Sequence, residues 1–235
     1  MVVADSGMRM PSFVLGRPVG EHHSPFVIAA LDCTKLGSVE QAVVAIDEAV
    51  THHCDAVKLT QLPIAWCARV FNHADPRGIK LITTVTDERT IEQLDWLGTA
   101  AFEIFFDWAD LDLVAAAART GKPLVLSVAN ATEAELAEVV ALARREGAAD
   151  VALVQRVLGS GLTDLDTLRR HNTVVGISDR ASSPGVVRSA IGRGARIVER
   201  RLAPRAIKAE LSALVRDCDL AWALLGNADQ PWTHN

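Results

Sequence analysis

Two short apolar runs near the carboxyl end decide the fold of this chain, Val174-Val175-Gly176-Ile177 and Ala195-Arg196-Ile197-Val198. Each has the length and composition of a buried β-strand. Each stops at polar residues, Ser178-Asp179-Arg180 after the first and Glu199-Arg200-Arg201 after the second. Because sites of parallel α/β proteins form at the carboxyl ends of strands, these endings predict an anion-binding or catalytic rim. The alternative is an exposed loop with ordinary surface charge.

Outside this stretch, strand-like and helix-like segments alternate along most of the chain. The other strand-like runs are 26–31, 56–59, 79–84, 101–106, 124–127 and 151–154. Eight strands, each followed by a helix-length segment, predict a single (β/α)8 TIM barrel with a closed parallel sheet. No Gly-x-Gly-x-x-Gly turn follows the first strand, which disfavours an open dinucleotide-binding sheet. We expect an extension or plug at 1–25, the barrel at 26–226 and a tail at 227–235.

The composition excludes several classes of partner. The 235 residues carry a formal charge of −5 and 5% aromatic side chains with no tyrosine, which disfavours nucleic-acid binding. The four cysteines are widely spaced and show no metal-binding pattern. No signal peptide or membrane-length apolar run is present, so we expect no membrane partner and a cytoplasmic location.

Lys58 is the most informative of the side chains expected at the mouth of the barrel. It lies within a strand, so its ammonium group is expected to be partly desolvated. It could bind phosphate, carry a proton or form an imine, or it could make a buried salt bridge with Glu103 or Asp32. None of the seven histidines lies at the carboxyl end of a strand, so no histidine-ligated metal is expected. Acidic residues there could hold magnesium, but the neighbouring arginines and Lys58 argue against a need for it.

Fragments spaced around the whole barrel carry a family resemblance. They include Asp55-Ala56-Val57-Lys58, Thr83-Thr84, Gly121-Lys122-Pro123 and Gly176-Ile177-Ser178-Asp179. In order and spacing the chain resembles, from Phe26 to Leu202, the barrel domain of the sialic acid synthases, which condense phosphoenolpyruvate with an amino sugar. The resemblance implies enolpyruvate contacts, with two supporting polar residues. The contacts would be Lys58, Thr84, Ser127 and Ser178, and the supporting residues Asp179 and Glu199.

The chain departs from this family at several of its functional positions. Arg180 and Arg201 stand where the family has its metal-binding histidines, and Glu103 replaces a lysine. We therefore expect no cofactor and loss of the family's divalent metal. The family's carboxy-terminal antifreeze-like domain is not found in the sequence. A homo-oligomer or a separate partner chain is expected in its place.

Two hypotheses for the function remain open. The first is a metal-independent enzyme that acts on an anionic keto acid or sugar acid. It would be a synthase, an aldolase-type lyase or a transferase, with chemistry related to that of phosphoenolpyruvate. Its catalytic residues would be Lys58, Glu103, Asp179 and Glu199, and its substrate-binding residues Thr84, Ser127, Ser178, Arg180 and Arg201. The second is a catalytically silent barrel that binds a metabolite or a protein partner, in which the arginines pair with the acids and close the old site.

Overall fold

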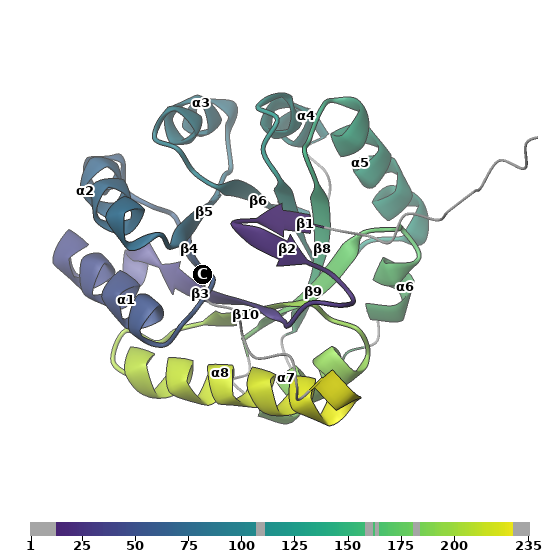
Figure 1. Cartoon of the computed structure of the whole chain (residues 1–235). Helices are drawn as coiled ribbons and strands as arrows, with labels where there is room; N and C mark the ends of the chain where they lie inside the picture. The colour runs from purple at the N-terminus through teal and green to yellow at the C-terminus, as the bar shows by residue number, and fades with distance from the viewer. Residues whose placement is uncertain (1–12, 107–110, 158–161, 163–164, 181–183, 228–235) are drawn as a thin grey trace, which may run out of the picture.

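A closed barrel of eight parallel strands forms the centre of the molecule, with helices arranged around it (Figure 1). The computed structural model describes residues 13–106, 111–157, 162, 165–180 and 184–227. The strands follow one another around the barrel in chain order, and the last pairs with the first. The predicted TIM barrel is confirmed. The barrel strands are β3 (Phe26–Asp32), β4 (Ala56–Thr60), β5 (Lys80–Thr84), β6 (Ala101–Phe106), β7 (Leu124–Val128), β8 (Val151–Val157), β9 (Val174–Asp179) and β10 (Ile197–Arg201).

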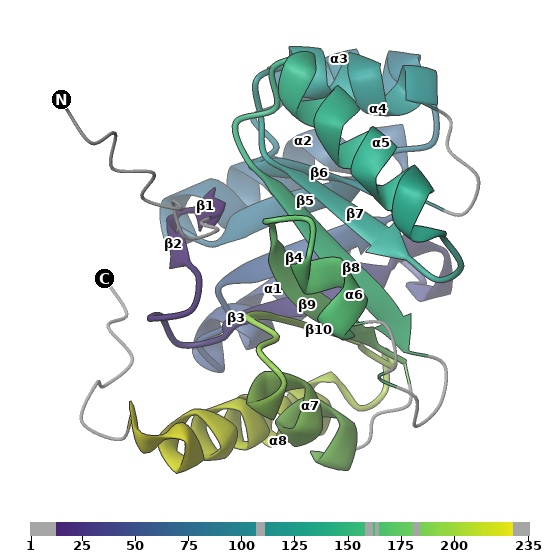
Figure 2. The ribbon, with the colours of Figure 1, turned by 90° about the vertical axis from the view of Figure 1, so that its right-hand side faces the viewer.

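Helices connect successive strands and cover the outside of the barrel (Figures 1 and 2). They are α1 (Val39–Thr51), α2 (Ile64–Ala74), α3 (Glu88–Trp96), α4 (Leu111–Arg119), α5 (Glu133–Arg145), α6 (Leu165–Arg169), α7 (Pro184–Gly192) and α8 (Ile207–Trp222). The helix α5 starts at a complete capping box, in which Thr132 and Glu135 bond each other's backbone N–H groups. In the described parts of the chain, no helix is both long and apolar enough to cross a membrane.

The strands are apolar on both faces because one face lines the barrel and the other lies under the helices. Outward residues such as Val27, Val57 and Val175 belong to one large cluster with helix residues such as Ile46 and Leu136. The alternate residues near the strand starts point inward and form a second cluster. This inner cluster contains Phe26, Ile28, Ala56, Ile82, Ala101, Val125, Ala152, Val154, Val174 and Ile197.

A two-stranded hairpin closes the amino-terminal end of the barrel (Figures 1 and 2). It pairs β1 (Phe13–Leu15) with β2 (Arg17–Val19), and its apolar side chains join the inner cluster. Arg17 anchors it through an ion pair to Asp55, just before β4, with Nε 2.5 Å from Oδ1. The backbone N–H of Val14 donates to Asp150, just before β8. The hairpin therefore fills the barrel end at which the strands begin, and the site must be sought at the other end, called here the mouth.

The polar endings that marked β9 and β10 in the sequence lie within these strands and not after them. β9 includes Ser178 and Asp179, and β10 runs from Ile197 through Arg201. Ladder pairing continues to Ser178 with Glu199 and to Asp179 with Arg200. Since successive strand residues face opposite sides, neighbours in these endings point in opposite directions. β9 runs two residues and β10 three residues beyond the end of its apolar run, and this difference decides which side chains reach the mouth.

Candidate functional site

A buried lysine joins two buried glutamates inside the barrel, between the apolar inner cluster and the mouth. Lys58 on β4 places its Nζ 2.5 Å from Glu103 Oε1 on β6 and 2.5 Å from Glu199 Oε1 on β10. The three side chains are at most 3% exposed. We call them the lysine cluster. The salt bridge to Glu103 that the sequence left as an alternative is thus present, and a second one to Glu199 accompanies it.

Three hydroxyl groups from neighbouring strands hold the glutamates in place. Thr84 Oγ1 donates to Glu103 Oε2 at 2.5 Å, and Ser127 Oγ donates to Glu103 Oε1 at 2.6 Å. Ser178 Oγ donates to Glu199 Oε1 at 2.7 Å. All three are buried, and all three were predicted as substrate contacts. In this structure they orient carboxylates, so they can donate to a substrate only by changing partners.

The charges of the lysine cluster do not balance, because two carboxylates share one ammonium group. Burial opposes the charge on Lys58, but Glu103 and Glu199 outweigh it and raise the lysine pKa. Burial raises the pKa of Glu199; Glu103 adds to this, and Lys58 only partly opposes it. Glu199 Oε2 is buried and has no hydrogen-bond partner among the residues that the structure describes. Glu199 is therefore the group in the cluster best suited to hold a proton, while Lys58 stays charged.

Arginines dominate the mouth above the lysine cluster. Arg201 pairs with Asp32, with its Nη2 2.6 Å from Oδ2. Arg180 is exposed, and among the described residues its guanidinium group forms no hydrogen bond or ion pair. Partial desolvation of the Arg180 side chain lowers its pKa, and the positive charges of Arg201 and Arg156 lower this pKa further. We call Arg156, Arg180 and Arg201 the arginine rim, whose positive charge suits an anionic ligand.

The ring of Phe105 lies between the lysine cluster and the arginine rim. Lys58 Nζ is 5.7 Å from the ring centroid, and Arg156 Cζ is 5.4 Å from it, both within cation–π range. Phe105 was not among the residues predicted at the mouth. The signal was in the sequence, because Phe105 follows the inward-facing Glu103 by two positions in β6.

Asp179 is the one predicted catalytic residue that the structure does not bring together with the others. It lies on the helix-facing side of β9, with Val175 and Ile177. Arg200 reaches it from the same side of β10, with Nη2 2.7 Å and Nε 3.2 Å from Oδ2. Both side chains are at most 2% exposed. We call these two residues the outer pair. Its place follows from the strand continuing through Asp179, which turns this side chain away from the mouth.

The described side chains at the mouth offer no group suited to a divalent metal. Over the described ranges, no group of three or more histidine, cysteine, aspartate or glutamate residues is arranged to hold a metal ion. Arg180 and Arg201, which match the metal-binding histidines of the resembled family, cannot coordinate a cation. A thiolate nucleophile is equally unsuited, because burial, helped by Asp32, raises the pKa of Cys33 to about 12.

Comparison with known proteins agrees with this architecture. A family model described as the NeuB family matches residues 39–210. Pseudaminic acid synthase of Helicobacter pylori is 33% identical over 96 residues, which are 40% of this chain and 28% of that protein. The spore coat polysaccharide biosynthesis protein SpsE of Bacillus subtilis is 23% identical over 230 residues, 80% of this chain and 62% of that protein. The chain therefore spans less than two thirds of the length of either relative.

Two solved structures share the fold. The crystal structure of Bacillus subtilis SpsE superposes with a TM-score of 0.80 at 22% identity, covering 95% of this chain and 76% of that one. The N-acetylneuraminic acid (sialic acid) synthetase of Leptospira borgpetersenii, in complex with citrate, superposes with a TM-score of 0.79 at 18% identity. The superposition covers 96% of this chain and 93% of that one. At these identities the likeness establishes the barrel architecture alone.

Proposed function

The chain belongs to the NeuB family, and from this membership we propose that it is a sugar-acid biosynthetic enzyme acting on a small anionic keto acid or sugar acid without a divalent metal. The names of its relatives, pseudaminic acid synthase and spore coat polysaccharide biosynthesis protein, support an activity on sugar acids. One observation carries the proposal: the charge-unbalanced lysine cluster lies buried beneath an arginine rim that includes Arg180, whose guanidinium group has no partner among the described residues.

Substrate binding is assigned to the arginine rim. Arg180 presents a guanidinium group with no partner among the described residues, and a carboxylate or phosphate can accept two parallel hydrogen bonds from such a fork. Arg201 is held by Asp32, so it contributes positive potential more than direct contacts. The ring of Phe105 offers an apolar wall between Arg156 and Lys58. Enolpyruvates and keto acids combine an anionic group with a flat apolar part, which suits this arrangement.

Proton transfer is assigned to Glu199 and charge stabilisation to Lys58. The raised pKa of Glu199 and its partnerless Oε2 support a role as proton donor to a carbonyl or enol oxygen. Lys58, whose pKa is raised by both glutamates, supports an oxyanion as a fixed positive charge. An imine-forming lysine would need a lowered pKa, so we do not assign that role to Lys58.

The proposal is tested by calorimetric titration of phosphoenolpyruvate into the full chain, with and without manganese. We expect binding with the same affinity in both conditions. Arg180→Ala should weaken it at least about tenfold, since one charge-assisted fork is lost. Binding only with manganese would refute metal independence. No heat in either condition would refute the enolpyruvate assignment.

A catalytically silent barrel is the second candidate, and one observation favours it. Lys58 is engaged by both glutamates and Arg201 by Asp32, so most of the charges near the mouth are already paired within the protein. In that case Lys58 and Glu199 would serve only to fill the interior. Metal-independent binding of phosphoenolpyruvate followed by turnover with an aldehyde sugar, lost in Glu199→Gln, would rule this candidate out. Binding without turnover across a panel of aldehyde sugars would favour it.

A further inference from the structure

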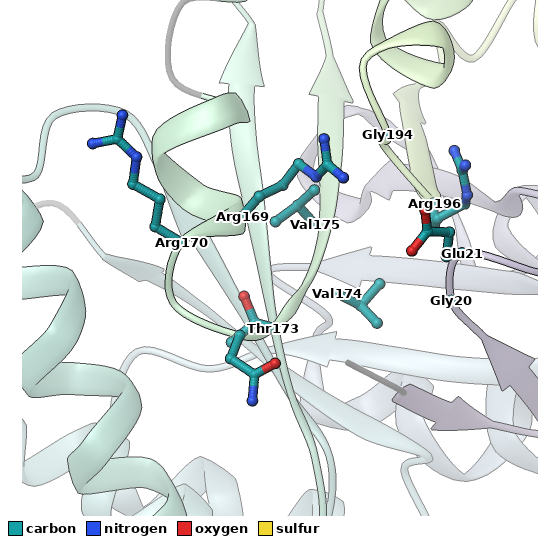
Figure 3. A pocket seen from close by; sticks show the side chains of 10 residues that line it. Gly20, Glu21, Arg169, Arg170, Thr173, Val174, Val175, Gly194 and Arg196 are labelled. Carbon is teal, nitrogen blue, oxygen red and sulfur yellow. The ribbon is translucent and has the colours of Figure 1, made fainter. Parts of the chain in front are cut away.

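A cationic cleft lies at the opposite end of the barrel from the mouth, where β9 and β10 begin (Figure 3). Its volume is about 400 Å³, within the range of small-molecule sites. Three arginines line it, Arg169, Arg170 and Arg196, with a single acid, Glu21. We call it the amino-terminal cleft, and no step of the proposed function uses it.

Three separate segments bring these charges together. Arg169 ends α6, Arg196 directly precedes β10, and Glu21 lies between the hairpin and β3. In Figure 3 the Arg169 side chain extends toward the side of the cleft that holds Arg196 and Glu21, whereas Arg170 points the other way. Gly194 has a φ of +96°, and a Cβ there would lie 3.1 Å from Arg169 Cζ. A glycine at 194 thus lets the Arg169 guanidinium group lie against this loop.

The polar groups of the cleft wall are incompletely compensated. Arg196 Nη1 donates to Ile191 O at 3.2 Å and Ala195 O at 2.9 Å, but its buried Nε has no partner in the described part of the chain. Burial lowers the pKa of Arg196, Glu21 opposes this, and Arg169 lowers the pKa further by repulsion. Thr173, at 4% exposure, also has a hydroxyl group without a partner. Two guanidinium groups that repel each other face a single carboxylate, so one positive charge is not compensated and a second negative charge would be favourable there.

We propose that the amino-terminal cleft binds a phosphate monoester, held between Arg169 and Arg196. Once Glu21 is displaced, Arg169 and Arg196 carry two positive charges, which match a dianionic phosphate, and its three oxygens can accept from both guanidinium groups. Glu21 is the internal counter-charge that the phosphate displaces. Because Glu21 belongs to the segment that joins the hairpin to β3, occupancy of the cleft is coupled to the position of that segment. This site is independent of the function assigned to the mouth.

Calorimetry at low ionic strength with inorganic phosphate, and then with glycerol 3-phosphate, tests the site on the full chain. Arg169→Gln and Arg196→Gln should each weaken binding at least about tenfold. Glu21→Gln should tighten it by about threefold or more, because it removes the competing charge. Arg170→Gln is the matched control and should change affinity by less than about twofold, since its side chain points away from the cleft and is screened by solvent.

Phosphate binding at the mouth must be separated from binding at the cleft. Because the arginine rim also suits phosphate, the cleft variants are compared in an Arg180→Gln background, in which binding at the rim is weakened and phosphate should still bind the cleft. The proposal would be overturned if the heat of phosphate binding disappeared in Arg180→Gln but persisted in Arg169→Gln. It would also be overturned if Arg170→Gln weakened phosphate binding as much as Arg169→Gln does. Absence of binding in the unaltered chain, or failure of glycerol 3-phosphate to compete with phosphate, would do the same. Arg169 is exposed, so Arg169→Gln should keep its fold even if Arg196, which lies over the Trp222 ring, tolerates no change.

Discussion

The lysine cluster and the outer pair are built from the same two strands, one residue apart, on opposite faces. Ser178 and Glu199 pair in register and face the barrel interior, whereas Asp179 and Arg200 pair in register and face the helices. Both groups are almost fully buried. The outer pair matches one cation with one anion, while the lysine cluster sets one cation against two anions and leaves Glu199 Oε2 without a partner. The balanced charges of the outer pair indicate a structural role. The excess negative charge of the lysine cluster indicates that Glu199 can exchange a proton.

Removing the cation from the outer pair should have the largest effect. Arg200→Met leaves Asp179 buried without its cation and should lower the free energy of unfolding by about 3–5 kcal/mol. The measurement is urea unfolding at pH 7. The double variant Arg200→Met, Asp179→Leu should recover most of the loss, because both charges are then gone. A loss below 1 kcal/mol in Arg200→Met would remove the structural role given to this pair.

The same substitution in the lysine cluster sharpens the comparison. Lys58→Met should lower the free energy of unfolding by about 1–3 kcal/mol at pH 7. This loss is smaller than that expected for Arg200→Met, because Glu199 can take up a proton when the ammonium group is removed. The substitution should nevertheless abolish phosphoenolpyruvate binding or turnover. Lowering the pH toward 5 should reduce the loss in Lys58→Met and leave that in Arg200→Met nearly unchanged. Equal losses at both pH values would contradict the assignment of the proton to Glu199.

Balancing the lysine cluster should change stability by a smaller amount and in the opposite direction. Glu199→Gln leaves Lys58 and Glu103 as a one-to-one pair. The raised pKa of Glu199 means that its protonation stabilises the native state below the unfolded glutamate pKa of about 4.3, and that this contribution disappears as pH rises through the folded pKa. Glu199→Gln should therefore match the unaltered chain near pH 4 and exceed it at pH 8, by on the order of 1 kcal/mol.

The smallest effect is expected at the mouth, where the ion pair is partly exposed. Arg201 is 32% exposed, so Asp32→Asn should cost less than about 1 kcal/mol at pH 7. Burial raises the pKa of Asp32, but Thr34 and Arg201 outweigh it and hold the pKa below its usual range. The stability that this carboxylate contributes is therefore present above the unfolded pKa of about 3.9 and is lost as pH falls through the folded value.

The free energy of unfolding should therefore be measured against pH for the unaltered chain and for Asp32→Asn. The two curves should converge below about pH 4. The freed Arg201 should also strengthen phosphoenolpyruvate binding about threefold, because a second guanidinium group becomes available. Weaker binding in Asp32→Asn would show that Asp32 positions Arg201 for the ligand. Leu36→Ala in the adjacent segment provides a control for a general loosening of this region.

The sequence was sufficient for the barrel but not for the direction of every polar side chain. Continuous apolar runs and capping signals located all eight strands, and the inward position of Lys58 followed from its place within a strand. Asp179 was assigned to the mouth because the apolar run stops at Ile177, although ladder pairing extends further. An error of one residue reverses the face of a strand side chain. The partners of Lys58 lie 45 and 141 positions away, so strand-level patterns alone left its ion pairs open.

Pairing of the first barrel strand with the last has a consequence for biosynthesis. Arg201 and Asp32 lie 169 positions apart, and β3 cannot meet β10 until that whole length has been translated. At about 5–20 residues per second the nascent chain exposes an unpaired edge of β3 for roughly 10 to 30 s. Open strand edges are templates for association between chains. Expression yield should therefore depend on translation speed and chaperone supply more steeply than the stability of the finished barrel would suggest.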